Sequence, residues 1–210
     1  MKAQWESIEQ WLGENAPFLL KNLRPGASSA AFAKLEAQIN RQLPDAFRAF
    51  YEIHDGQRSQ APQGLFYGLR FMPLAQVCKD QKIWAGLVDM NEELAYAMYS
   101  QPAGHIKPLY ANPLWIPFAN DQSGNSLGLD LDPDTQGTPG QVIVFGRDEN
   151  TKRLVAPSFE RFVNAFIEQL EGGNFVIDKG EKLLEFAHYP DGTRFEQSSK
   201  HPLDVFGRGM

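Results

Sequence analysis

The stretch from Leu114 to Arg147 constrains the fold more than any other part of this 210-residue chain. Leu114–Phe118 is an apolar run, and in Ser126–Leu131 leucines alternate with smaller or acidic residues. Gln141–Phe145 is rich in β-branched and aromatic residues, which favour a sheet interior. Alternation with a period of two predicts a strand with one buried face. We therefore expect a meander of three strands joined by two polar turns.

The two turns carry most of the polar residues of this stretch. Asp121, Ser123 and Asn125 surround a glycine in the first turn, and Asp132–Thr138 contains proline, aspartate and glycine in the second. Such residues form turns because they tolerate positive φ or bind their own backbone through the side chain. Exposed turns on a rigid sheet are also common binding sites.

Helical patterns flank the meander. Apolar residues at helical spacing predict a first helix through Trp5 and Trp11 and a second that begins at Ser28. Further helices are predicted from Leu43-Pro44 toward Gly56, over Met90–Tyr99, and from Ser158 to Gly172-Gly173, the last with the stripe Phe159, Phe162, Val163, Phe166 and Leu170.

Together these patterns predict a single α+β domain. Its twisted, mainly antiparallel sheet would contain Phe66–Met72 and the three meander strands, with helices packed mostly on one face. We expect residues 1–173 to form this domain and residues 174–210 to be a C-terminal extension. That extension would contain a hairpin around the turn Pro190–Gly192 and a loose tail from His201.

Composition narrows the functional classes. The net charge of −6 and the absence of a basic stripe argue against a nucleic-acid-binding protein. No apolar run approaches the length of a membrane span, and the N-terminus shows no cleavable signal pattern. The single cysteine, Cys78, cannot form an internal disulfide, so we expect a cytoplasmic protein.

Two motifs resemble a known family. The first is W-I-P-F-A-x-D-x-x-G-N-x-L-x-L-D-L-D-P over Trp115–Pro133, followed by G-Q-V-I and A-P-S-F; the second is L-P-x-x-F-R-x-F-Y-x-x-H-D-G over Leu43–Gly56. In order and content they resemble the Smi/Knr group of the SUKH superfamily. That group includes fungal regulators of cell-wall assembly and bacterial immunity proteins that neutralise polymorphic toxins. The resemblance implies no catalytic residue, metal or cofactor.

The carboxylates of the meander favour one enzymatic alternative. Asp121, Asp130 and Asp132 lie close in sequence and suggest an aspartate-dependent hydrolase or a metal site. The spacing of Asp130, Asp132 and Asp134 also matches the start of an EF-hand loop, but Thr135 and Gln141 stand where glycine and glutamate are required. Turn formation explains these aspartates more simply, so we expect no catalytic residue and no metal.

The prediction from sequence is therefore a non-enzymatic protein-binding module. The resemblance and the acidic charge favour an immunity protein whose partner is a basic toxin domain. The alternative is a regulatory scaffold that resembles the fungal cell-wall regulators. The expected contact residues are exposed polar groups of three loops: Asp55, Gln57, Asp121, Ser123, Asn125, Asp132, Asp134 and Thr138.

Overall fold

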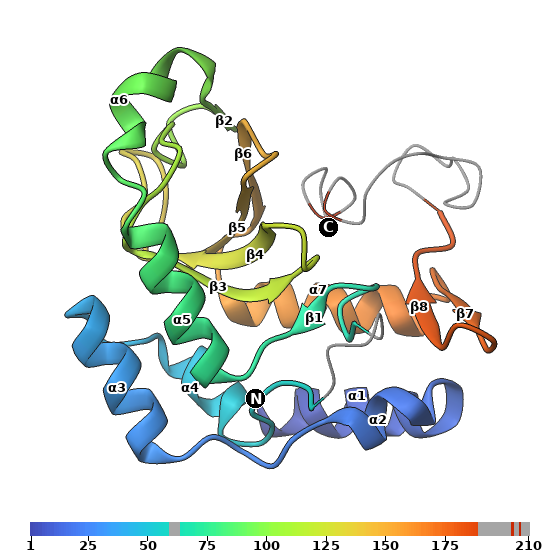
Figure 1. Cartoon of the computed structure of the whole chain (residues 1–210). Coiled ribbons are helices and arrows are strands. Elements are labelled where there is room, and N and C mark those ends of the chain that lie inside the picture. Colours follow the sequence, from blue (N-terminus) through green and yellow to red (C-terminus); the bar gives the residue numbers. More distant parts are fainter. Residues whose placement is uncertain (59–63, 189–202, 204–205, 207–210) are drawn as a thin grey trace.

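A computed structural model describes residues 1–58, 64–188, 203 and 206 of the chain. In that part a six-stranded sheet has the order β1-β3-β4-β5-β6-β2 (Figure 1). Its strands are β1 (Arg70–Phe71), β2 (Tyr99–Gln101), β3 (Trp115–Asn120), β4 (Asn125–Asp130), β5 (Gln141–Gly146) and β6 (Thr151–Ala156).

The sheet is antiparallel except at one edge. Strand β4 lies between β3 and β5, with Leu129 opposite Ile116 on one side and Val142 on the other. Only β2 runs parallel, beside β6. The predicted α+β fold with a mainly antiparallel sheet is thus confirmed, and the three meander strands lie within a residue or two of their expected positions.

Two of the helices begin at serine residues that the sequence predicts as N-caps. The backbone N–H of Ala31 donates to Ser28 Oγ over 3.3 Å, and that of Arg161 donates to Ser158 Oγ over 3.2 Å, so both predicted caps are confirmed. The helices are α1 (Lys2–Asn15), α2 (Pro17–Asn22), α3 (Ser29–Ile39), α4 (Asp45–Tyr51), α5 (Leu74–Ala85), α6 (Met90–Leu94) and α7 (Phe159–Glu171), with a 3₁₀ turn η1 at Ala95–Ala97.

One face of the sheet packs on an aromatic core. Helix α7 runs beneath the sheet with α1 below it (Figure 1), and every residue of its predicted apolar stripe is buried. Phe159 contacts Phe118 of β3 and Phe47 of α4 edge-to-face, with ring centroids 5.3 and 5.1 Å apart. This packing joins the N-terminal helices, the sheet and α7 into one core.

The opposite face of the sheet is also buried. Trp115, Ile143 and Phe145 project from this face and pack against Trp84 of α5 and Ile106 of the following segment. All residues of β4 and β5 are buried as a result. The expectation of one buried face for Ser126–Leu131 is therefore wrong, because the chain between α5 and β3 covers the other face.

Two other local predictions need correction. Within Phe66–Met72 only β1 is a strand, because Tyr67 and Gly68 have positive φ and Phe66 to Leu69 forms a tight turn. The predicted helix Met90–Tyr99 ends at Leu94, continues as η1, and gives way to β2 at its last residue.

The C-terminal extension contributes a separate two-stranded sheet. Strands β7 (Val176–Asp178) and β8 (Leu183–Glu185) pair antiparallel, and Phe186 then stacks on Tyr67 with ring centroids 3.6 Å apart. The predicted turn Pro190–Gly192 lies outside the described residues, as does most of the tail, of which Leu203 and Phe206 are buried. The domain boundary at residue 173 stays a prediction.

Gly56 offers a test of the loop that links α4 to β1. Its φ is +69°, and an added Cβ would lie 2.3 Å from the Pro73 backbone nitrogen. We expect Gly56→Ala to lower the free energy of unfolding by about 3 kcal/mol, measured by urea denaturation. Gly173→Ala is the matched control, because Gly173 has φ +78° but no atom within 4 Å of an added Cβ. It should cost only about 1 kcal/mol, and equal losses in the two variants would contradict the steric account.

Candidate functional site

Asp55 and Gln57, both predicted as contact residues, are buried side chains that accept hydrogen bonds from the backbone of other segments. Asp55 Oδ1 accepts the backbone N–H of Leu74 at the start of α5 over 2.7 Å. Gln57 Oε1 accepts the backbone N–H groups of Leu65 and Phe71 over 3.1 and 2.9 Å. Both residues are buried, so their side chains do not form the exposed contact surface expected of them. Their polar atoms satisfy backbone donors that burial would otherwise leave unpaired.

The turn between β3 and β4 is also organised from within. Asp121 Oδ1 accepts the backbone N–H groups of Ser123 and Asn125 over 2.7 and 3.0 Å. Asn125 is buried, and its Oδ1 accepts the backbone N–H of Asp148 over 2.9 Å. Of the three predicted residues in this turn, only Ser123 is fully exposed, while Asp121 is half-buried.

The turn between β4 and β5 carries the remaining predicted residues. Asp132 pairs with Lys107 Nζ at 2.6 Å. Burial opposes its ionisation, yet hydrogen bonds from Lys107 and Asn112 keep the pKa of Asp132 below its usual value. Asp134 is half-buried and Thr138 is exposed.

The predicted contact surface is not one continuous patch. The turn with Asp121 and the turn with Asp132 lie at opposite ends of β4, and a strand of this length spans about 20 Å. Asp55 and Gln57 lie beside β1 and α5, inside the chain. A single partner surface centred on all three loops is therefore not supported by their positions.

Asp130, the centre of the hydrolase alternative, has no exposed surface. Its Oδ2 accepts Gln141 Nε2 over 2.9 Å and its Oδ1 accepts the backbone N–H of Asp132 over 3.0 Å. Burial raises the pKa of Asp130 to about 6 despite these hydrogen bonds. A carboxylate enclosed in this way does not meet a substrate. Within the described ranges, no group of three or more His, Cys, Asp or Glu side chains is placed to hold a metal ion.

The structure instead presents a pocket of about 310 Å³ between α5 and the β3–β4 turn. Trp84 and Tyr110 form its aromatic wall, with ring centroids 5.7 Å apart. Gln122 and Gly124 of the predicted turn form part of its opposite side. The full lining is Asp80, Ile83, Trp84, Leu87, Tyr110, Asn120, Gln122, Gly124, Ser126 and Arg147, and we call this site the α5 pocket.

The α5 pocket combines an apolar wall with polar ends. Ile83 is 62% exposed at its rim and adds apolar surface to that of the aromatic wall. Asn120 Nδ2 donates to Asp80 Oδ2 over 3.4 Å. Burial raises the pKa of the Asp80 carboxyl above its usual value. Arg147 pairs at 3.3 Å with the exposed Asp148. This arrangement suits the side chains of a protein partner, with apolar contact in the centre and polar contact at the rim.

Sequence reasoning did not find the α5 pocket. In Leu74–Val88 the apolar residues Leu74, Val77 and Trp84 indicate a short helix followed by an extended piece, a pattern that assigns no binding face. The available signal was Ile83, an apolar residue outside the buried stripe of α5. Tyr110 joins Ile83 only through the tertiary fold.

Known proteins resemble this chain over most of its length. A sequence profile described as the SMI1 / KNR4 family (SUKH-1) matches residues 26–165. The KNR4/SMI1 homolog 2 of Debaryomyces hansenii is 33% identical over 90% of this chain and 38% of its own length. The cell wall biosynthesis/cell cycle regulator smi1 of Schizosaccharomyces pombe is 33% identical over 89% of this chain and 39% of its own length. The glucan synthesis regulatory protein of Neurospora crassa is 29% identical over 93% of this chain and 43% of its own length.

These relatives correct the functional prediction. They are fungal proteins named as regulators of cell-wall or glucan synthesis, so the expectation of a toxin-immunity protein is wrong and its regulatory alternative is better supported. The chain spans about two-fifths of the length of these relatives. In the described part of the chain, no helix is both long and apolar enough to cross a membrane.

Because Asp130 is buried, we expect the free energy of unfolding of the native chain and that of Asp130→Asn to differ by an amount that depends on pH. The folded-state pKa of about 6 lies above the ordinary 3.8, so ionisation costs stability once the pH rises through this interval. Each pKa unit is worth about 1.4 kcal/mol. Asp130→Asn should therefore gain up to about 3 kcal/mol relative to the native chain between about pH 4 and pH 7. Urea denaturation of both proteins at each pH measures this, and a difference that stays constant with pH would contradict it.

Proposed function

Because this chain belongs to the SMI1/KNR4 family (SUKH-1), we propose that it is a non-enzymatic regulatory domain that binds protein partners in the control of cell-wall assembly. The regulatory role comes from the names of its fungal relatives. We place the protein in the cytoplasm, where a buried, unpaired cysteine such as Cys78 is ordinary.

The α5 pocket is the observation that carries the binding proposal. An exposed Ile83 beside Trp84 and Tyr110 leaves apolar surface in contact with water. Contact with a partner would remove that surface from water and release free energy in proportion to its area. The aromatic wall supplies the type of side chain that dominates binding energy at protein interfaces.

The contacts of three meander aspartates argue against an enzymatic role. The aspartate that best fitted acid–base chemistry, Asp130, is enclosed in the sheet and bound by Gln141. Asp121 accepts hydrogen bonds from Ser123 and Asn125 of its own turn. Asp132 accepts hydrogen bonds from the side chains of Lys107 and Asn112, in the segment before β3. Each carboxylate thus has a structural explanation that involves no substrate.

A domain exchange in fission yeast tests the proposal. This chain would replace the matching part of the Schizosaccharomyces pombe relative, of which it covers 39%. We expect the chimaera to support cell-wall biosynthesis, measured as resistance to wall-digesting enzymes. Ile83→Glu should abolish that support while the protein accumulates normally, because a charge at the pocket rim disrupts apolar contact and Ile83 is 62% exposed.

Ala75→Glu is the control for this variant. It places the same new charge on the same helix, at an exposed position that does not line the α5 pocket. The chimaera with Ala75→Glu should behave as the unmodified one. Loss of support in both variants, or in neither, would contradict the assignment of the pocket, and failure of the unmodified chimaera would contradict the regulatory role.

A further inference from the structure

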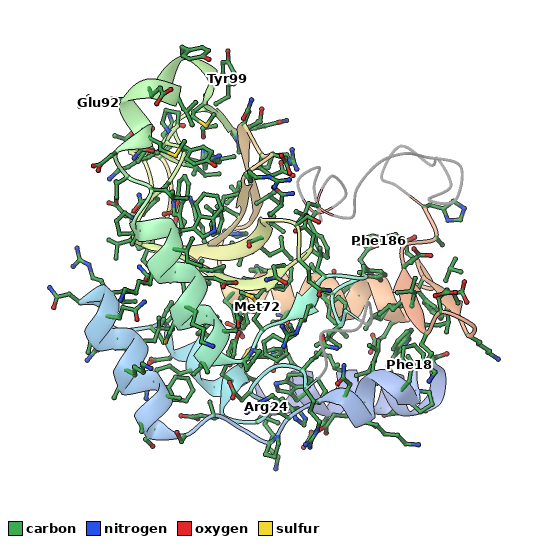
Figure 2. All side chains as sticks on the ribbon, in the orientation of Figure 1. Phe18, Arg24, Met72, Glu92, Tyr99 and Phe186 are labelled. Carbon is green, nitrogen blue, oxygen red and sulfur yellow. The ribbon has the colours of Figure 1, made fainter. Side chains whose placement is uncertain are left out.

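The large apolar side chains that remain exposed are concentrated in one short stretch. Among the described residues they are Ile83, Val88, Tyr96 and Tyr99, which are 62, 37, 81 and 60% exposed. Ile83 belongs to the α5 pocket. The other three lie in residues 88–101, which form α6, η1 and β2 and which we call the α6–β2 lobe. This lobe lies at the end of the molecule far from α1 and α2, where Figure 2 labels Glu92 and Tyr99.

The α6–β2 lobe carries two tyrosines and two glutamates on one short segment. Helix α6 passes directly into η1, and the joining residues Leu94 and Ala95 keep right-handed helical dihedrals. Glu92 and Glu93 precede Tyr96 by four and three residues in this continuous helical segment. The Tyr99 hydroxyl donates to the Tyr96 carbonyl oxygen over 3.5 Å, so the Tyr99 side chain lies against the backbone of η1.

The lobe is anchored to the sheet. Asn91 forms two hydrogen bonds with the backbone of Ala111, of 2.8 and 2.9 Å. The backbone N–H of Tyr99 donates to the Asn150 carbonyl over 3.0 Å. Met98 is buried, with Lys152 Nζ 3.7 Å from its sulfur. The exposed tyrosines therefore stand on a fixed base, which lowers the entropy that binding would cost.

The charge of the lobe is uniformly negative. Residues 83–104 include Asp89, Glu92 and Glu93 but no lysine, arginine or histidine. Within the described residues, the adjoining strand exposes no free cation beside the tyrosines, because Lys152 is buried and Arg153, itself mostly buried, pairs with Glu149 at 2.8 Å. Aromatic rings beside carboxylates attract cations by both cation–π contact and ion pairing.

We propose that the α6–β2 lobe binds a basic segment of a partner protein. Arginine or lysine side chains of that segment would stack on Tyr96 and Tyr99 and pair with Glu92 and Glu93. This inference rests on the proposed function, because it names the chemistry of a partner for a protein-binding domain. It adds a second contact surface beside the α5 pocket.

A labelled peptide tests the inference on the whole chain. The probe is a short synthetic peptide of alternating arginine and leucine, followed by fluorescence anisotropy, and its counterpart carries glutamate in place of arginine. We expect the arginine peptide to bind and the glutamate peptide not to bind. The double variant Tyr96→Ala/Tyr99→Ala, which keeps the net charge, should weaken binding about tenfold. Glu92→Gln/Glu93→Gln should weaken it similarly.

The control is Glu14→Gln/Glu160→Gln, which removes two exposed carboxylates from α1 and α7. It changes the net charge as the Glu92/Glu93 variant does and should leave binding nearly unchanged. Equal loss in both glutamate variants, no loss in the tyrosine variant, or no binding of the arginine peptide would overturn the inference. If the yeast chimaera is active but the peptide experiment fails, the lobe proposal is wrong and the regulatory role stands. If the peptide binds as expected but the chimaera is inactive, the regulatory role is wrong and the lobe proposal stands.

Discussion

Burial of the central sheet on both faces is the constraint on which the rest of the structure depends. Strands β4 and β5 have no exposed residue. Gly128 is required at the centre, because a Cβ there would lie 2.5 Å from the Phe145 ring and 2.8 Å from the Ile116 carbonyl oxygen. With aromatic side chains on its second face, the sheet is stable only if the chain between α5 and β3 covers that face. The α5 pocket and the α6–β2 lobe are the outer surface of this cover.

Polar groups buried with the sheet fix the cover in place. Gln141 Nε2 donates to the His105 carbonyl over 2.8 Å and to Asp130, so it ties the loop before β3 to β4 and β5. Lys152 stands 5.9 Å from the ring centroids of Tyr110 and Trp115, and burial lowers its pKa to about 8. Each such group gives the irregular cover a specific position, which apolar contact alone does not. Because these hydrogen bonds fix the chain between α5 and β3, the α5 pocket and the tyrosines of the α6–β2 lobe keep a defined position although much of this segment is irregular.

The sequence was informative where one local pattern determines one element. The leucine alternation, the two serine caps and the phenylalanine stripe of α7 predicted their elements well. Strand β6 was not predicted, because its burial does not alternate with a period of two: Thr151, Arg153 and Leu154 are half-buried, whereas Lys152 is buried. Asp55 and Gln57 resembled exposed turn residues, yet they bind backbone N–H groups that only the tertiary fold brings near.

The wrong prediction of a toxin-immunity protein also came from a property that says nothing about position in the fold. The motifs placed the chain in the right family, but a net charge of −6 fitted a toxin inhibitor as well as a regulator. Charge counted over the whole chain does not show where it lies, and the structure separates the three predicted acidic loops. The α5 pocket combines Trp84, Tyr110 and Gly124, which are distant in sequence, so no local pattern predicts it.

Site-specific photo-crosslinking in the yeast chimaera tests the central claim most directly, namely that partners bind on the cover of the sheet's second face. A benzoylphenylalanine would be placed at Ile83, at Tyr96, or at Thr138 on the exposed β4–β5 turn, and adducts would be identified by mass spectrometry. The account predicts partner adducts from Ile83 and Tyr96 and none from Thr138. Adducts from Thr138 with none from Ile83 or Tyr96 would contradict it and return the contact surface to the acidic turns.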